Sequence, residues 1–155
     1  MRSIYLDTSV ISAYHDLRVP EFSELTREMF TKLGSRFVFY ISPTVLSEIA
    51  NANALRRKQM LGLVRSLGLR SLLNDPAILM LASSYVSRAI LPKDSLADAT
   101  HLAHATVHKM DYLLSWNFRH LVNEHRKEAF MHHNLSRGLH LPMILSPGNL
   151  LEGVK

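Results

Sequence analysis

Short apolar runs alternate along this chain with longer stretches in which apolar residues recur every three or four positions. The runs at residues 3–6, 37–41, 112–114 and 143–145 are bounded by polar residues or prolines, which predicts buried strands. The stretches between them predict amphipathic helices. Strands that alternate with helices in this way predict an α/β fold with a mainly parallel central sheet flanked by helices.

Capping and breaking residues set the expected ends of the helices. Prolines open several of them, because the fixed φ of proline suits a first helical turn, and glycines close others. Residues 70–73 fit either a short strand or a loop, and residues 117–121 fit a short helical turn. No repeat or linker interrupts the pattern, so one domain is expected over residues 1–155. The expected helices cover residues 8–14, 20–33, 43 to Gly62 or Gly68, 76–91 and 94–107.

Polar residues stand beyond three predicted strand ends, where open parallel sheets form their sites. Asp7 directly follows the first strand, Glu48 lies about two helical turns beyond the second, and residues 115–117 follow the third. Asp94 and Asp98 lie one turn apart on the helix before that third strand, so both carboxylates can point along one face. Each acid alone also suits a structural role, such as capping of a helix by Asp7. Grouped carboxylates repel one another unless a cation compensates, and oxygen ligands without any cysteine favour Mg²⁺ or Mn²⁺ over tetrahedral zinc. We therefore expect a divalent-cation site at this edge of the sheet.

Four blocks of the sequence match the pattern of one known family, in the family's order and over most of residues 3–121. They are residues 4–11 (IYLDTSVI), 42–49 (SPTVLSEI), 96–103 (LADATHLA) and 111–118 (DYLLSWNF). Together these blocks resemble the PIN-domain ribonucleases, many of which are toxins of the VapC type. The resemblance implies a PIN-like fold and a magnesium- or manganese-dependent endoribonuclease. It also implies that the catalytic, metal-holding acids are Asp7, Glu48 and Asp98.

The segment after the third predicted strand departs from the family pattern. PIN domains commonly carry another acid there, whereas this chain has Asn117 and His120. Asn117 can still bind a metal or orient a water through its amide oxygen, and a one-metal mechanism stays open beside a two-metal one. Thr8 and Ser115 are expected to hydrogen-bond a ligand or a phosphate. His101 is expected to hydrogen-bond the acid one helical turn before it.

The expected reaction is hydrolysis of an RNA phosphodiester bond. A metal held by Asp7 and Asp98 would lower the pKa of a water and neutralise the phosphate during in-line attack. Glu48 is then a ligand, a general base or a water-orienting group. Attack by water predicts products with a 5′-phosphate and a 3′-hydroxyl.

The charge balance agrees with a polyanionic partner. The chain carries 18 Lys and Arg against 13 Asp and Glu, a formal net charge of +5, and its pI is near 9.7. Arg56, Arg57 and Lys58 lie in a window between Glu48 and Asp75 that holds no acid, so they are candidate RNA-binding residues. A solvated helix face explains the same cluster equally well.

Composition excludes several other classes of protein. The chain has no cysteine, which excludes disulfide scaffolds, cysteine nucleophiles and iron–sulfur centres. No apolar run is long enough for a membrane helix or a signal peptide, so no membrane association and a cytoplasmic location are expected. No P-loop, GxGxxG or GxSxG pattern occurs, which argues against nucleotide cofactors and serine hydrolysis.

Some signals support competing interpretations. His101, His104 and His108 fall near one face of a predicted helix and can hold a transition metal, and Trp116 either stacks on a base or packs in the core. The missing fourth acid favours a noncatalytic RNA-binding or interaction module on the same scaffold. Within the enzyme class, the alternative to a toxin is an RNA-processing nuclease outside a toxin–antitoxin system. The family resemblance further implies a homodimer and a cognate antitoxin protein as partners.

Overall fold

Five parallel strands form the central sheet of the computed structural model, which describes residues 1–153. The strand order is β3-β2-β1-β4-β5. This confirms the expected α/β fold with a parallel sheet, and the last two residues of the predicted domain lie outside the described part. The strands are β1 (Arg2–Leu6), β2 (Phe37–Ile41), β3 (Arg70–Ser71), β4 (Tyr112–Leu114) and β5 (Met143–Leu145).

The order of the strands reverses at β1, which pairs with β2 on one side and with β4 on the other. Ile4 is opposite Phe39 of β2 and Tyr112 of β4. In open parallel sheets, a crevice forms at such a reversal, outside the carboxyl ends of the strands. Asp7 and Ser115 are the residues that directly follow β1 and β4. The topology therefore places both of them at the crevice.

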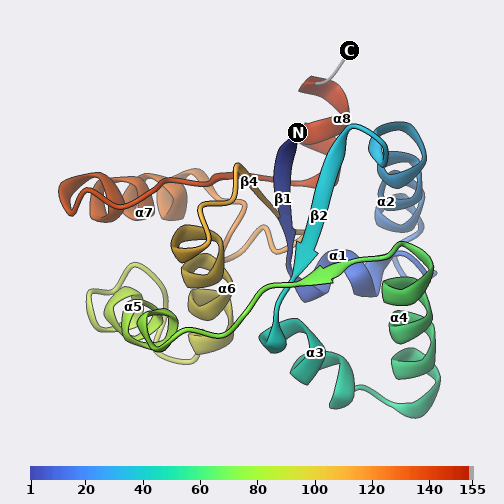
Figure 1. The fold of residues 1–155 in the computed structure, drawn as a ribbon, viewed down its shortest axis with the longest axis horizontal. Coiled ribbons are helices and arrows are strands. Elements are labelled where there is room, and N and C mark those ends of the chain that lie inside the picture. The colour runs from blue at the N-terminus through green and yellow to red at the C-terminus, as the bar shows by residue number, and fades with distance from the viewer. Residues whose placement is uncertain (154–155) are drawn as a thin grey trace.

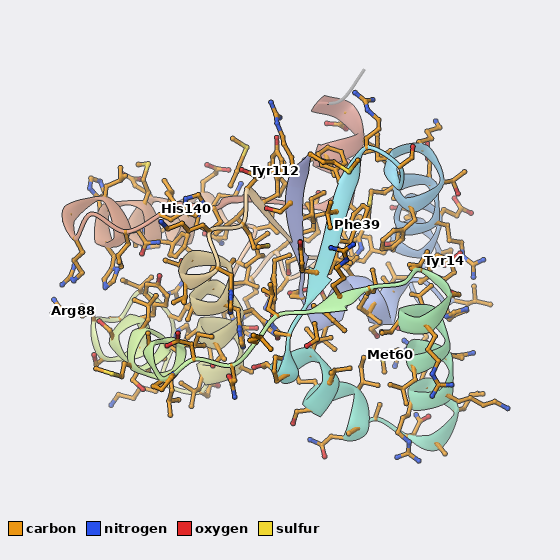
Figure 2. All side chains as sticks on the ribbon, viewed as in Figure 1. Tyr14, Phe39, Met60, Arg88, Tyr112 and His140 are labelled. Atoms are coloured by element: carbon orange, nitrogen blue, oxygen red, sulfur yellow. The ribbon has the colours of Figure 1, made fainter. Side chains whose placement is uncertain are left out.

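Helices cover the sheet from two sides. In Figure 1, α5, α6 and α7 lie to one side of the central strands, and α2 and α4 lie to the other. Phe39 projects from β2 toward α2 (Figure 2), where its ring lies 5.2 Å from that of Phe30. The helices are α1 (Thr8–Ala13), α2 (Pro20–Leu33), α3 (Pro43–Ala50), α4 (Ala54–Ser66), α5 (Pro76–Ser87), α6 (Leu96–Val107), α7 (Glu124–Ser136) and α8 (Pro147–Gly153).

The single helix expected from residue 43 to Gly62 or Gly68 is wrong, because the chain breaks it into α3 and α4. Asn51 ends α3, and Asn53 caps α4 by accepting a hydrogen bond from the backbone N–H of Arg56. Asparagine competes with the helical backbone for hydrogen bonds and therefore favours caps over helix interiors. The break lets α4 turn back and pack against α1.

Other boundaries and elements refine the sequence expectations. Residues 70–73 resolve into the two-residue strand β3, and α5 ends at Ser87, before Ala89 takes a left-handed conformation with φ of 56°. Helices α7 and α8 were not expected. Only Phe130, His133 and Asn134 are buried on α7, so its sequence carries a weak apolar stripe. Over residues 1–153, no helix combines the length and the apolar character needed to cross a membrane.

Candidate active site

Asp7 occupies the junction between β1 and α1, and its side chain caps that helix. The backbone of Asp7 is extended (φ −77°, ψ 173°), and its carboxylate accepts a hydrogen bond from the N–H of Val10 at 3.4 Å. The hydroxyl of Ser9 donates to Oδ1 and the hydroxyl of Ser115 donates to Oδ2, each at 2.5 Å. Asp7 is thus the N-cap of α1, the structural role that its sequence position allowed. Both of its carboxylate oxygens also accept hydrogen bonds from serines at the crevice.

Burial works against the negative charge of Asp7. The residue is only 3% exposed, and burial raises the pKa of its carboxyl group. Attraction by His101 and the two serine hydrogen bonds oppose this rise, whereas repulsion by Asp98 adds to it. A buried carboxylate with another acid in electrostatic range is a position at which a cation is stabilising.

Glu48 projects from α3 and is held by two donors from other helices. Nε2 of His101 lies 2.6 Å from Glu48 Oε1, and the hydroxyl of Thr8 donates to the same oxygen at 2.9 Å. Because a carboxylate only accepts, His101 is the donor. Burial opposes the charge of Glu48, but the hydrogen bonds from His101 and Thr8 outweigh it and hold the pKa of Glu48 below its usual range.

A buried hydrogen-bonded chain continues inward from His101. Its Nδ1 lies 2.6 Å from the hydroxyl of Tyr5, which lies 2.7 Å from the hydroxyl of Ser42, the N-cap of α3. Burial opposes protonation of His101, yet Glu48, Asp7 and Asp98 together raise its pKa. The chain thereby connects β1, α3 and α6 behind the acids and fixes the imidazole from both of its nitrogens.

Asp98 lies in the first turn of α6 and contacts the segment that follows β4. Its Oδ2 lies 3.1 Å from Nδ1 of His120, which also lies 3.2 Å from the hydroxyl of Ser95. The backbone N–H of His120 donates to Oδ1 of Asn117 at 2.9 Å, and the N–H of Asn117 donates to the hydroxyl of Ser115 at 2.9 Å. The amide oxygen considered as a metal ligand is therefore engaged in capping this turn.

The structure gives His101 a different partner from the one expected. The spacing of the sequence suggested Asp98, one turn earlier on the same helix, whereas His101 binds Glu48 of α3 and Asp98 contacts His120. The reason is that His101 faces the sheet and is 2% exposed, while the side chain of Asp98 is 22% exposed. Sequence distance along a helix could not reveal either cross-helix partner.

The donor set at this edge suits a hard divalent cation. Asp7, Glu48 and Asp98 supply carboxylate oxygens, and within residues 1–153 no lysine or arginine donates to any of them. No group of three or more acidic or histidine side chains is gathered closely enough in the described chain to enclose a metal by itself. Mg²⁺ usually keeps several waters and needs only one or two carboxylates, so such a site does not require a closed protein cage.

The basic residues chosen from the sequence divide into two kinds. The guanidinium of Arg56 donates to the backbone carbonyl and hydroxyl of Ser12, at 2.5 and 2.7 Å, and thus ties α4 to α1. Arg57 and Lys58 are exposed on α4. The guanidinium of Arg57 donates to the carbonyl of Ala50 in α3 over a long distance of 3.5 Å, and the ammonium of Lys58 has no hydrogen-bond partner within residues 1–153, so Lys58 is the more accessible of the two to a phosphate.

Trp116 packs inside the protein, and its neighbour Phe118 is the exposed aromatic residue. Trp116 is 8% exposed, stacks on Phe22 with ring centroids 4.1 Å apart, and donates from Nε1 to the hydroxyl of Thr26 at 2.9 Å. Phe118 is 47% exposed. Between the two interpretations of Trp116, the structure supports packing, and no pattern in the sequence distinguishes Phe118 as the exposed ring.

His101 and His104 of α6 and His108, the C-cap of that helix, have separate partners. His101 contacts Glu48, Nε2 of His104 lies 3.2 Å from the hydroxyl of Thr44, and Nε2 of His108 lies 2.8 Å from the carbonyl of Leu73. Although His104 and His108 stack with centroids 6.2 Å apart, the described residues hold no three-ligand cluster there. Their arrangement is explained by hydrogen bonding and packing.

Several solved structures share this fold at low sequence identity. A Rickettsia felis VapBC2 structure, bound to a DNA fragment from the complex's promoter, aligns with a TM-score of 0.58 and 13% identity, covering 93% of this chain and 98% of that one. VapBC-1 from nontypeable Haemophilus influenzae aligns with a TM-score of 0.59 and 13% identity, covering 94% and 98%. Mycobacterium tuberculosis VapC20, a toxin that cleaves the sarcin-ricin loop, aligns with a TM-score of 0.56 and 18% identity, covering 74% and 92%.

These alignments define the class of fold. The five-stranded parallel sheet flanked by helices is that of VapC-type PIN domains, so the resemblance seen in the four sequence blocks is confirmed for the fold. No protein-family model and no curated protein sequence matches this chain. The match extends over nearly the whole length of the two VapBC chains.

Proposed function

We propose that this protein is a Mg²⁺- or Mn²⁺-dependent endoribonuclease and the toxin of a type II toxin–antitoxin pair. The observation that carries the proposal is the placement of three acids that no lysine or arginine of residues 1–153 pairs with: Asp7 is buried at the end of β1, Glu48 is bonded by Thr8, the residue after Asp7, and Asp98 contacts His120. They lie at the crevice beyond β1, where parallel sheets form active sites. In this proposal the protein acts on RNA in the cytoplasm.

Each acid has a distinct task in this proposal. Asp7 and Asp98 would hold the cation, since Asp7 is a buried acid that no lysine or arginine of residues 1–153 pairs with. His101 and Thr8 both bond Oε1 of Glu48, so Oε2 is left to accept a proton from the attacking water or to bind the cation. When bound, the divalent ion supplies a Lewis acid that offsets the phosphate charge and favours ionisation of water.

Groups around the acids position the substrate. His120 holds Asp98 from the far side of the crevice, and the hydroxyls of Ser9 and Ser115 fix the two oxygens of Asp7. Arg57 and Lys58 attract the RNA backbone, because exposed cations release condensed counterions when they contact phosphates. These groups orient the acids and the strand but do not exchange covalent bonds with it.

The test is cleavage of a mixed RNA pool by purified protein in Mn²⁺, Mg²⁺ or EDTA. Wild type should cut only with metal and leave 5′-phosphate ends, and Asp98→Asn should lose cutting while keeping the wild-type circular dichroism spectrum and Tm. Asp94→Asn is the matched control, because Asp94 is exposed four residues earlier. Equal cutting by Asp98→Asn and wild type, or cutting in EDTA, would reject the metal-dependent site.

A noncatalytic RNA-binding module is the second candidate, and one observation favours it. Asn117 stands where PIN nucleases commonly have an acid, and its amide oxygen is occupied by the N–H of His120. If wild type binds RNA in a salt-dependent manner but never cuts it, even against total cellular RNA with Mn²⁺, this candidate replaces the nuclease. Cutting that Asp98→Asn lacks would reject it. An RNA-processing nuclease outside a toxin–antitoxin system would instead cut RNA without arresting growth when expressed.

Two partners are part of the proposal. Two of the similar structures are VapBC complexes, which supports a cognate antitoxin for this chain. A homodimer is supported by the exposure of Leu79 and Met80 on α5, at 61% and 74%. Light scattering should give the mass of a dimer for wild type and of a monomer for Met80→Glu. A wild-type monomer at all concentrations would remove the dimer from the proposal.

A further inference from the structure

A small cleft of about 180 Å³ lies between α1, the segment before α2 and the turn after β4. It shares a wall with the acid site, because the Ser9 hydroxyl that donates to Asp7 belongs to a residue of its lining. Its volume suits one planar ring system. The lining includes Ser9, Ser12, Asp16, Val19, Phe22 and Trp116.

One wall of the cleft is a rigid aromatic stack. Phe22 and Trp116 are nearly parallel, with an interplanar angle of 10°. The hydrogen bond from Trp116 to Thr26 holds the indole in place. The exposed Phe118 packs on this pair at an angle, tilted 47° from Phe22 and 57° from Trp116, with ring centroids 5.9 and 6.0 Å away. An aromatic ring that is half exposed and fixed by its neighbours is a suitable platform for stacking.

The rest of the lining is mixed in character. Ala13 and Val19 are apolar, and the hydroxyls of Ser9 and Ser12 already bond Asp7 and Arg56. Asp16 is the acid of the lining and pairs with Arg18, whose side chain is 83% exposed, and Arg119, the residue after Phe118, is also exposed. Apolar and aromatic walls suit the faces of a planar ring, and exposed guanidinium groups suit the phosphates attached to such a ring.

We infer that this cleft is a subsite for one nucleobase of single-stranded RNA, with Phe118 as the stacking platform at its rim. The base belongs to a nucleotide next to the bond at the acid site, because Ser9 contributes to both places. The inference takes its ligand class from the proposed nuclease function. It adds a position at which the protein binds a base of the RNA strand and not only its phosphates. Base stacking of this kind tolerates all four bases, since each has a π-face.

Trp116 gives a direct readout, because it is the sole tryptophan in the chain and lines the cleft. Its fluorescence is followed in EDTA, where no cleavage occurs, while the full-length protein is titrated with oligoadenylate, oligouridylate or oligocytidylate of equal length. An abasic ribose-phosphate oligomer of the same length is the control. We expect quenching by the base-containing oligomers and none by the abasic one. Equal quenching by the abasic oligomer, or no quenching by any oligomer, overturns the subsite.

Replacement of Phe118 tests the platform separately. Loss of one stacked base costs about 1–3 kcal/mol, so Phe118→Ala should weaken binding of oligouridylate about 5- to 150-fold and raise KM more than it lowers kcat. Phe118→Tyr should restore binding. Leu135→Ala on α7 is the control for loss of an exposed apolar side chain, since Leu135 is 61% exposed. Wild-type affinity in Phe118→Ala overturns the inference.

The two proposals fail differently. If wild type cuts RNA while Phe118→Ala keeps wild-type KM and quenching, the subsite is wrong and the nuclease stands. If base-dependent quenching and its loss in Phe118→Ala are observed but no RNA is cut, the nuclease is wrong and the subsite stands.

Discussion

Nε2 of His101 and Oε1 of Glu48 lie 2.6 Å apart and join α6 to α3 across the crevice. The imidazole is 2% exposed, whereas the side chain of Glu48 is 38% exposed. A buried group thus orients an acid that can reach solvent and substrate. Orientation by a fixed hydrogen-bond donor is a common way to place a carboxylate for catalysis.

His101→Gln should lower RNA cleavage by about 10- to 100-fold, the usual cost of losing such an orienting partner. Glutamine retains an N–H donor but cannot bridge Glu48 and Tyr5 as the imidazole does. Cleavage rates under single-turnover conditions measure the effect. His132→Gln is the matched control, because His132 is 75% exposed on α7. Wild-type rates in His101→Gln would mean that Glu48 needs no such orientation.

Asp7→Asn should raise the Tm of the metal-free protein and remove its response to Mn²⁺. Burial raises the pKa of Asp7, so its charge at neutral pH opposes folding, and asparagine removes that charge while remaining a good N-cap. Saturating Mn²⁺ should stabilise wild type by about 3 kcal/mol, or about 5–10 °C in Tm. Thermal melts with EDTA and with Mn²⁺ measure both effects. An equal Mn²⁺ shift in wild type and variant would show that Asp7 holds no metal.

The buried imidazole of His104 should cause the free energy of unfolding to decrease as the pH falls from about 6.5 to about 4. Burial and the nearby His101 and His108 lower the pKa of His104 to about 4, against 6.5 for an unperturbed histidine. Between these values the unfolded state binds more protons, so the free energy of unfolding decreases with falling pH, by up to about 3 kcal/mol.

Urea unfolding at several pH values measures this dependence for wild type and for His104→Phe, which retains a ring for stacking on Tyr5. The variant should lose that part of the slope between pH 4 and 6.5. Identical pH profiles for the two proteins would show that His104 titrates normally.

Replacing Arg56 should affect the stability of the fold, whereas replacing Arg57 and Lys58 should affect RNA binding. Arg56→Ala breaks the bonds to Ser12 and should cost about 1.5–3 kcal/mol of unfolding free energy. The double variant of Arg57→Ala and Lys58→Ala loses only the long, exposed bond from Arg57 to Ala50, so it should change the free energy of unfolding by less than about 0.5 kcal/mol and reduce the salt slope of RNA binding by about 2. Urea denaturation and binding at several salt concentrations measure these effects. An unchanged salt slope would mean that RNA does not cross α4.

Much of the fold followed from local pattern. The boundaries of α2, β2, β4 and β5 agree with the apolar runs and their capping residues, because periodicity and caps act within a few residues. The break between α3 and α4 and the presence of α7 did not follow. Both depend on packing against other elements, and α7 in particular buries too few residues for its pattern to be visible.

Some features of the candidate site also followed from the sequence, and others required the tertiary structure. The sequence by itself placed Asp7 and Glu48 near strand ends, because the order of strands and helices fixes which residues reach the carboxyl edge of a parallel sheet, and the family resemblance of residues 96–103 added Asp98. Only the tertiary structure decided that His101 binds Glu48, that His120 binds Asp98, and that Phe118 rather than Trp116 is exposed. Partners and exposure depend on how distant segments pack, and hydrophobic periodicity carries no information about which neighbour covers a given side chain.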